Sequence, residues 1–210
     1  MKLYDYYRST ASYRVRIALT IKNISYEKIP IHLVNNGGEQ HSADYLALNP
    51  QGLVPTLNEN GHIISQSLAI IEYLEEICPT PALLPANPFA RAQVRSLALS
   101  VACDIHPLNN LRVLKRLREQ FDANEDQVIS WYHHWLKEGF DAFERRLETT
   151  PHKHPFCYGT EVSLADICLI PQIYNAKRFD FSMARYPLIN EIEAHCLTLP
   201  AFKNTAPDGM

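Results

Sequence analysis

Hydrophobic and polar positions follow different patterns in the two halves of the chain. Before residue 80, short apolar runs with strand spacing alternate with stretches of helical spacing, and after residue 88 helical spacing is almost continuous. Proline fixes φ and restricts the preceding residue, so the proline-rich stretch CPTPALLPANP between the halves should be extended. We expect a first domain over residues 1–80, a linker over 81–87 and a second domain over 88–210.

The first half is predicted to contain four strands and two helices. The predicted strands are Lys2–Tyr7, Ile29–Leu33, Val54–Leu57 and His62–Ile64, and the predicted helices begin near Ser12 and Gln66. A short polar turn, Asn58–Gly61, suits a hairpin between the last two strands. This order indicates a thioredoxin-like α/β domain with a mixed four-stranded sheet, although order alone also allows other α/β folds.

The second half is predicted to be an all-helical bundle. Two long helices are expected over residues 89–118 and 125–147, and a shorter final helix over 186–197. His106–Pro107 falls inside the first of these and should kink it. Ser163–Asp166 has the [ST]-x-x-[DE] spacing of a capping box and should begin a further helix. The fold class is therefore α/β plus all-α.

Composition and charge exclude several classes of protein. With 46% apolar and 20% charged residues, the 210-residue chain has the composition of a soluble globular protein. A net charge of −3 gives no reason to expect nucleic acid or an anionic membrane as partner. No apolar stretch is long enough to span a bilayer and the N-terminus lacks a signal-peptide core, so we expect a cytoplasmic protein. Five scattered cysteines without a CxxC pair argue against a disulfide framework or a metal site.

The first candidate site is the junction between the first strand and the first helix, which includes Ser9, Thr10 and Ser12. Ligands of open α/β sheets collect at such junctions, and thioredoxins keep their reactive cysteines there. Here the polar side chains are hydroxyls. A hydroxyl beside a helix N-terminus can stabilise a thiolate that a ligand brings. The alternative is that these residues only cap the helix.

Two further candidate sites lie on the same edge of the predicted sheet. A cis Val54–Pro55 bond would present the backbone N–H and C=O of Val54 to a peptide-like ligand, whereas an ordinary trans proline at a strand start is the alternative. Gln66 and Ser67 open a helix whose N-terminus suits a carboxylate, or else they form a plain N-cap. All three candidates belong to the first domain.

Several segments resemble the zeta-class glutathione transferases, whose best-known members are maleylacetoacetate isomerases. The resemblance rests on RSTASYRVRIAL, ALNPQGLVPTL and QSLAIIEYLEE in the first half, and on HPLNNLRVLK, VSLADICLIPQIYNAKRF and YPLI in the second. It covers nearly the whole chain. By this resemblance, reduced glutathione is the expected cofactor and a homodimer the expected assembly.

The resemblance also implies roles for individual residues. Ser9 and Thr10 should support the glutathione thiolate, while Ala11 replaces a cysteine that is common in the family, so the working sulfur should belong to glutathione. The residues expected to bind glutathione are Ser9, Thr10, Ala11, Gln40, Val54, Gln66, Ser67, His106 and Asn110. The alternative for His106 is a polar residue tolerated at a proline kink.

The implied reaction is the glutathione-dependent conversion of maleylacetoacetate to fumarylacetoacetate in tyrosine and phenylalanine breakdown. Its substrate is a small unsaturated dicarboxylic acid, which Arg178 and Arg8 are expected to bind. The alternative for either arginine is a solvated surface charge. Alternative functions are maleylpyruvate isomerisation, general glutathione transfer or dehalogenation of small α-halo acids, and a non-catalytic glutathione-binding module.

Overall fold

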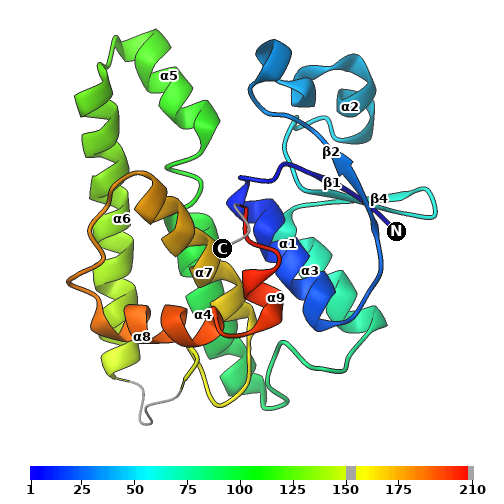
Figure 1. The fold of residues 1–210 in the computed structure, drawn as a ribbon, viewed down its shortest axis with the longest axis vertical. Coiled ribbons are helices and arrows are strands. Elements are labelled where there is room, and N and C mark those ends of the chain that lie inside the picture. Colours follow the sequence, from blue (N-terminus) through cyan, green and yellow to red (C-terminus); the bar gives the residue numbers. More distant parts are fainter. Residues whose placement is uncertain (150–154, 208–210) are drawn as a thin grey trace. The chain divides into compact units, whose positions relative to one another are not determined.

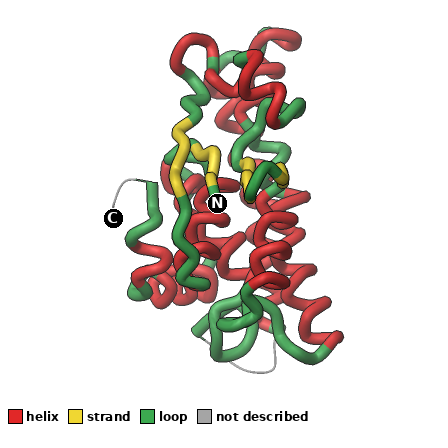
Figure 2. The backbone as a smooth tube through the Cα atoms, turned by 90° about the vertical axis from the view of Figure 1, so that its right-hand side faces the viewer, coloured by secondary structure: helices red, strands yellow, loops and turns green. Residues whose placement is uncertain are grey.

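The computed structural model describes residues 1–149 and 155–207. The chain divides into two compact units, Met1–Ala82 with Leu199–Met210, and Leu83–Thr198. The segment after Thr198 therefore belongs to the first unit, although the sequence placed it with the helical domain. Among the described residues, all strands lie in the first unit. Figure 2 colours these strands yellow.

The first unit contains a four-stranded mixed sheet with helices (Figure 1). Its elements are β1 (Lys2–Asp5), α1 (Thr10–Ile21), β2 (Glu27–Pro30), η1 (Asn35–Gly37), η2 (Glu39–His41), α2 (Ala43–Leu48), β3 (Thr56–Glu59), β4 (His62–Ser65), α3 (Ser67–Ile77) and α9 (Pro200–Lys203). The strand order is β2-β1-β3-β4, with β1 parallel to β2 and both other pairs antiparallel. The predicted thioredoxin-like arrangement is confirmed.

The core of the first unit lies where the sheet meets α1 and α3, which pack against each other. Leu3 and Leu57 pair across β1 and β3 and are fully buried. Ile70 and Leu74 contribute the apolar stripe of α3, as its helical spacing predicts. Burying this stripe together with the sheet face stabilises the unit through the hydrophobic effect.

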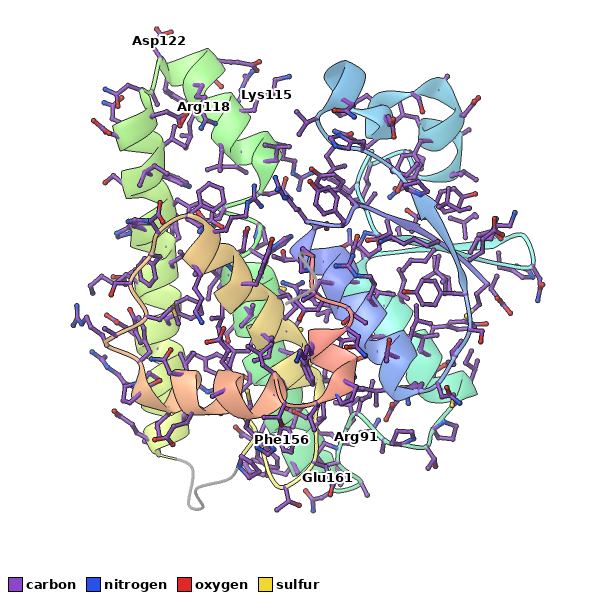
Figure 3. All side chains as sticks on the ribbon, viewed as in Figure 1. Arg91, Lys115, Arg118, Asp122, Phe156 and Glu161 are labelled. Carbon is purple, nitrogen blue, oxygen red and sulfur yellow. The ribbon has the colours of Figure 1, made fainter. Side chains whose placement is uncertain are left out.

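The second unit is all-helical in its described part. It consists of α4 (Pro88–Asp104), α5 (Leu111–Phe121), α6 (Glu125–Glu148), α7 (Leu164–Arg178) and α8 (Pro187–Cys196). Arg118 of α5 forms a bidentate ion pair with Glu125, the first residue of α6, donating from Nε to Oε1 at 2.9 Å and from Nη2 to Oε2 at 2.7 Å. Between these helices, Asp122 adopts a left-handed conformation (φ 50°) that ends α5; Figure 3 labels Arg118 and Asp122.

One predicted helix of the second unit was wrong. Instead of a kinked helix over residues 89–118, α4 ends at Asp104 and α5 begins at Leu111. Pro107 has no N–H to continue a helix, and it disfavours helical geometry at His106. Asn110 then starts a new helix, because its side chain accepts a hydrogen bond from the Arg112 N–H at 3.1 Å.

The capping box predicted at the start of α7 is confirmed. The fully buried Asp166 carboxylate accepts hydrogen bonds from the Ser163 N–H at 2.8 Å and from the Ser163 hydroxyl at 2.7 Å. It also accepts one from the Cys157 N–H at 2.7 Å. Burial raises the pKa of Asp166, and these hydrogen bonds act in the opposite direction. One side chain thus ties the preceding loop to the helix start.

Candidate functional site

Ser9 lies at the N-cap of α1, after the short loop of residues 6–8 that follows the end of β1 at Asp5. Its Oγ accepts a hydrogen bond from the Ser12 N–H at 3.2 Å, so the capping alternative is observed. A hydroxyl has one donor and two acceptor positions, and capping uses only an acceptor. The Ser9 proton therefore stays available to a ligand, and the two interpretations of this residue are compatible.

The first turn of α1 presents backbone N–H groups beside Ser9. Thr10 is buried and Ala11 is half-buried. The Ala11 N–H has no acceptor among the described residues, as is usual for the first turn of a helix. Such groups, with the helix dipole, favour an anion at this position.

Arg16 holds the loop that carries Arg8 and Ser9. Its guanidinium donates to the Tyr7 carbonyl at 2.9 Å and to the Thr205 carbonyl at 3.0 Å. It also pairs at 2.7 Å with Asp5, which is fully buried at the end of β1. These hydrogen bonds hold β1, the loop and the last segment of the chain together. Since Thr205 is 189 residues from Arg16, the sequence did not indicate this contact.

The Val54–Pro55 peptide bond is cis. Neither the N–H nor the C=O of Val54 has a hydrogen-bond partner among the described residues. The preceding Leu53 carbonyl is held by the Tyr45 hydroxyl at 2.7 Å and by the Asn49 amide at 2.8 Å. The sequence did not indicate a role for Tyr45 or Asn49, because residues 43–48, which form α2, show no strong helical periodicity.

The N-terminus of α3 has the features of a carboxylate site. Gln66 has a positive φ of 73° and makes no side-chain cap, so the first N–H groups of α3 lack a capping side chain. Ser67 is buried, and its Oγ lies 3.4 Å from the guanidinium of Arg14, which is itself buried. The Gln66 side chain donates to Gln51 at 2.9 Å. Arg14 and Gln51 were not among the predicted site residues.

The sheet register brings three of these features to one edge. Tyr4 of β1 pairs with Thr56 of β3, and Thr56 pairs with Ser65 of β4. The loop after β1, the chain before β3 and the chain after β4 therefore lie side by side. Ser9, Val54 and Ser67 belong to these three segments.

Gln40 lies in the short helix η2, before α2, and among the described residues its side-chain contacts are with Leu33 and His41 and not with the sheet edge. It is buried, and its amide nitrogen lies 3.4 Å from the Leu33 carbonyl and 3.2 Å from the His41 ring. Its amide oxygen has no partner among the described residues. A ligand donor would satisfy that oxygen.

His106 and Asn110 lie in the loop between α4 and α5 of the second unit. His106 is half-buried, and its N–H bonds the Val101 carbonyl at 2.9 Å where α4 ends. Asn110 caps α5, so one of its side-chain acceptor positions is used for folding. The neighbouring Asn109 is buried and donates to the Tyr132 carbonyl at 3.1 Å, which holds this loop on α6.

The two predicted substrate arginines are exposed. Arg178 ends α7, and its guanidinium donates to Asn175 at 3.3 Å and lies 5.2 Å from the centre of the Phe179 ring. Arg8 lies over the Tyr7 ring at 5.1 Å. The remaining guanidinium N–H groups of both have no acceptor among the described residues.

Across the described parts of the chain, no cluster of three or more His, Cys, Asp or Glu side chains that could bind a metal is found. The five cysteines are free thiols, three of them buried. Burial raises the pKa of Cys157 and of Cys196 well above the usual value, so these thiols stay protonated at neutral pH. No helix in the described residues is long and apolar enough to cross a membrane.

The fold and this edge define the class of the protein: a thioredoxin-like unit without a thiol at the start of α1, followed by an all-helical unit. Family models agree with both parts. The glutathione S-transferase N-terminal domain matches residues 3–82, and the glutathione S-transferase C-terminal domain matches residues 110–193.

Individual relatives narrow the assignment within this family. It is 48% identical over 206 residues to a "probable maleylacetoacetate isomerase" of Vibrio cholerae, covering 98% of this chain and 95% of the relative. A solved bacterial "maleyl pyruvate isomerase" of the zeta class has a TM-score of 0.97 at 45% identity, covering 100% and 98% of the two chains. A solved "maleylacetoacetate isomerase" of Methylobacterium extorquens, with bound malonate and GSH, has a TM-score of 0.96 at 39% identity, with the same coverage. The chain belongs to the glutathione S-transferase family, and within it to the zeta class.

Proposed function

We propose that this protein is a glutathione-dependent cis–trans isomerase that converts maleylacetoacetate to fumarylacetoacetate in tyrosine and phenylalanine breakdown. The observation that carries the proposal is the sheet edge shared by Ser9, Val54 and Ser67, in a chain that is 48% identical to a probable maleylacetoacetate isomerase. We propose further that residues 1–80 bind glutathione and that residues 88–210 contribute the site for the acidic substrate.

The residues of this edge fit glutathione group by group. The unpaired N–H and C=O of Val54 match a peptide-like backbone. The uncapped start of α3, with Gln66, Ser67 and the nearby guanidinium of Arg14, matches a carboxylate. Ser9 and the first turn of α1 match the sulfur. We assign Gln40, His106 and Asn110 to the same cofactor.

Ser9 and α1 are sufficient to hold the sulfur as an anion. A free thiol has a pKa of about 8.5. Lowering it by ~2 units needs ~2.7 kcal/mol of preference for the thiolate. A hydrogen bond to a charged group contributes roughly 1.5–3 kcal/mol, and a helix N-terminus about 0.3–1 kcal/mol. The Ser9 hydroxyl therefore donates to the sulfur, with Thr10 and the Ala11 N–H beside it.

When bound, glutathione supplies a thiolate that adds reversibly to the conjugated double bond and leaves again after rotation about the resulting single bond. Arg178 holds a substrate carboxylate through its free guanidinium N–H groups, and Arg8 is the second cation. Fixing the carboxylates orients the alkene toward the sulfur and keeps the acid bound while its central bond turns.

Isomerisation of maleylpyruvate is the second candidate. It is favoured by the zeta-class maleyl pyruvate isomerase, whose structure has a TM-score of 0.97 to this chain. Both substrates are small maleyl acids with two carboxylates, so the residues proposed above serve either. The two functions differ only in how the site accommodates the length of the keto acid.

A glutathione-dependent isomerase assay tests the proposal. Purified protein is given maleylacetoacetate, maleylpyruvate or dichloroacetate, each with and without reduced glutathione. We expect the highest kcat/KM with maleylacetoacetate and no turnover without glutathione. Faster turnover of maleylpyruvate would select the second candidate. Glutathione binding without turnover of any acid would indicate a binding module instead.

We also propose that the protein works in the cytoplasm as a homodimer. The free thiols support a reducing compartment, because structural disulfides are rare there. The homodimer rests on membership of the family. Light scattering after size-exclusion chromatography tests it, and a mass of one chain would refute it.

A further inference from the structure

The C-terminal end of α7 is connected to α6 by a hydrogen bond between side chains and by a ring contact. Arg178 donates from Nη1 to the Asn175 amide oxygen at 3.3 Å. The Asn175 amide nitrogen donates in turn to the Tyr132 hydroxyl at 2.5 Å. Phe179, next to Arg178, stacks on the Tyr132 ring with centroids 4.1 Å apart and planes 22° apart. The neighbouring His133 ring bonds the Phe179 carbonyl at 2.7 Å.

Tyr132 is the buried residue on which these contacts converge. It is fully buried on α6, so its ring has no freedom to follow a moving arginine. Burial raises the pKa of Tyr132, and the phenol therefore keeps its proton at neutral pH. Its backbone carbonyl accepts the Asn109 amide, which holds the loop of His106 and Asn110. One buried residue thus joins Arg178 to that loop.

A neutral amide suits the task of orienting a substrate arginine. Arg has only donors, so the Asn175 oxygen must face Arg178 and the Asn175 nitrogen must face Tyr132. A carboxylate at position 175 would pair with the guanidinium and compete with an acidic substrate. The amide fixes the direction of the arginine and leaves its charge, and its other N–H groups, for a ligand carboxylate.

We propose that Asn175 and Tyr132 are positioning residues that hold Arg178 in the geometry that binds the carboxylate of a small dianionic acid. This inference rests on the proposed function, because it takes Arg178 as the substrate cation. The effect is on substrate binding and not on sulfur chemistry. An exposed arginine that is already oriented loses less rotamer freedom when it binds.

The test measures the KM and kcat for maleylacetoacetate, the Kd of glutathione and the pH at which bound glutathione ionises. Asn175→Leu keeps the approximate volume and removes both hydrogen bonds. We expect KM to rise roughly tenfold, the change that corresponds to about 1.4 kcal/mol, with the two glutathione readouts unchanged. Tyr132→Phe removes only the hydroxyl, and we expect a KM increase of about threefold.

Asn190→Leu is the matched control. Asn190 lies on α8 of the same unit, is half-buried like Asn175, and donates to the Met183 carbonyl at 2.8 Å, so its replacement also removes a part-buried amide hydrogen bond. It does not contact Arg178, and KM should not change. Asn175→Ser serves as a second variant if Asn175→Leu does not fold, as checked by thermal unfolding, and it should also raise KM.

A double-mutant cycle with Arg178→Ala decides the outcome. If Asn175 acts through Arg178, Asn175→Leu adds no further loss once Arg178 is gone. Additive losses, or KM values for the Asn175 and Tyr132 variants equal to that of Asn190→Leu, would overturn the positioning role alone. If Arg178→Ala itself leaves KM unchanged, the substrate role proposed for Arg178 fails and this inference fails with it.

Discussion

At the residue scale, Ser9 combines a folding role with the proposed chemical one. Its Oγ caps α1 through the Ser12 N–H, and its hydroxyl proton is left to donate to a sulfur. The same turn has Ala11 where the family commonly has a cysteine, so it carries no protein thiol. The proposed chemistry therefore depends on how strongly one hydroxyl and one helix start favour an anion.

Replacing Ser9 with alanine should raise the pKa of bound glutathione. Losing a hydrogen bond worth roughly 1.5–3 kcal/mol to an anion corresponds to a rise of about 1–2 units. The measurement is the ultraviolet absorbance of the thiolate as a function of pH. Below the new pKa the rate should fall in proportion to the thiolate fraction.

The control for this change is Ser42→Ala. Ser42 caps α2 in the same way, accepting the Tyr45 N–H at 3.3 Å. Both variants lose a cap, which costs about 0.5–2 kcal/mol of stability. Only Ser9→Ala should move the thiolate titration. Equal titration curves for both variants would refute the role of Ser9.

Arg178 supplies the second prediction at this scale. Arg178→Ala should raise the KM for maleylacetoacetate by about 10–100-fold, because a charged hydrogen-bonding partner of the substrate contributes roughly 1.5–3 kcal/mol. The Kd of glutathione, measured by calorimetry, should stay the same. Arg145→Ala removes an exposed arginine of α6 as a control and should change neither value. Parallel losses of substrate and glutathione binding would contradict the assignment.

At the element scale, α7 depends on the carboxylate at its start. Asp166 is fully buried and accepts three hydrogen bonds, from the Cys157 N–H and from the N–H and hydroxyl of Ser163. The same helix ends at Arg178. The stability of α7 therefore bears on the substrate site, even though Asp166 has no chemical role in our proposal.

Removing this carboxylate should destabilise the protein strongly. Asp166→Ala leaves buried donors without an acceptor, and each such group costs about 1–3 kcal/mol. We expect a total loss of roughly 2–5 kcal/mol in urea unfolding. Asp126→Ala, at an exposed position in the first turn of α6, is the control and should change stability by less than about 1 kcal/mol. A loss at Asp166 no larger than the control would mean that the capping box is dispensable.

At the scale of the whole molecule, the chain returns to its first unit after passing through the second. Phe202 is fully buried in the first unit, and its carbonyl accepts the Tyr13 hydroxyl at 2.7 Å. The Thr205 carbonyl accepts a hydrogen bond from Arg16, which also holds the Tyr7 carbonyl before Ser9. The last segment therefore supports the loop that carries the proposed catalytic serine.

Phe202→Ala should consequently weaken the first unit. Truncating a buried phenylalanine costs about 3–5 kcal/mol, through lost apolar burial and the cavity that remains. Phe121→Ala, at a residue that is 66% exposed, should stay within about 0.5 kcal/mol of the parent protein. Urea unfolding measures both. Equal stabilities of the two variants would mean that the last segment contributes little to the unit.

Local pattern alone determined much of this protein. Alternation and helical spacing located β1, β4, α1, α3 and α6, and the Ser163–Asp166 spacing located the start of α7. The other two strands were predicted with shifted bounds, because β2 is Glu27–Pro30 instead of Ile29–Leu33 and β3 is Thr56–Glu59 instead of Val54–Leu57. These features depend on neighbours within a few residues, which a sequence displays directly. The resemblance of whole segments, and not the spacing, indicated glutathione and named the candidate binding residues.

Tertiary structure decided what depends on residues far apart in the chain. The break between α4 and α5 depends on Asn110 capping a new helix, which competes with a simple kink at Pro107. The placement of Leu199–Met210 in the first unit depends on contacts such as Tyr13 with Phe202, 189 residues apart. Arg14 beside Ser67 and Tyr132 beside Asn175 likewise come together only on folding. A linear pattern records which side chains have apolar or polar character, but their partners are determined only when the packed core fixes their positions.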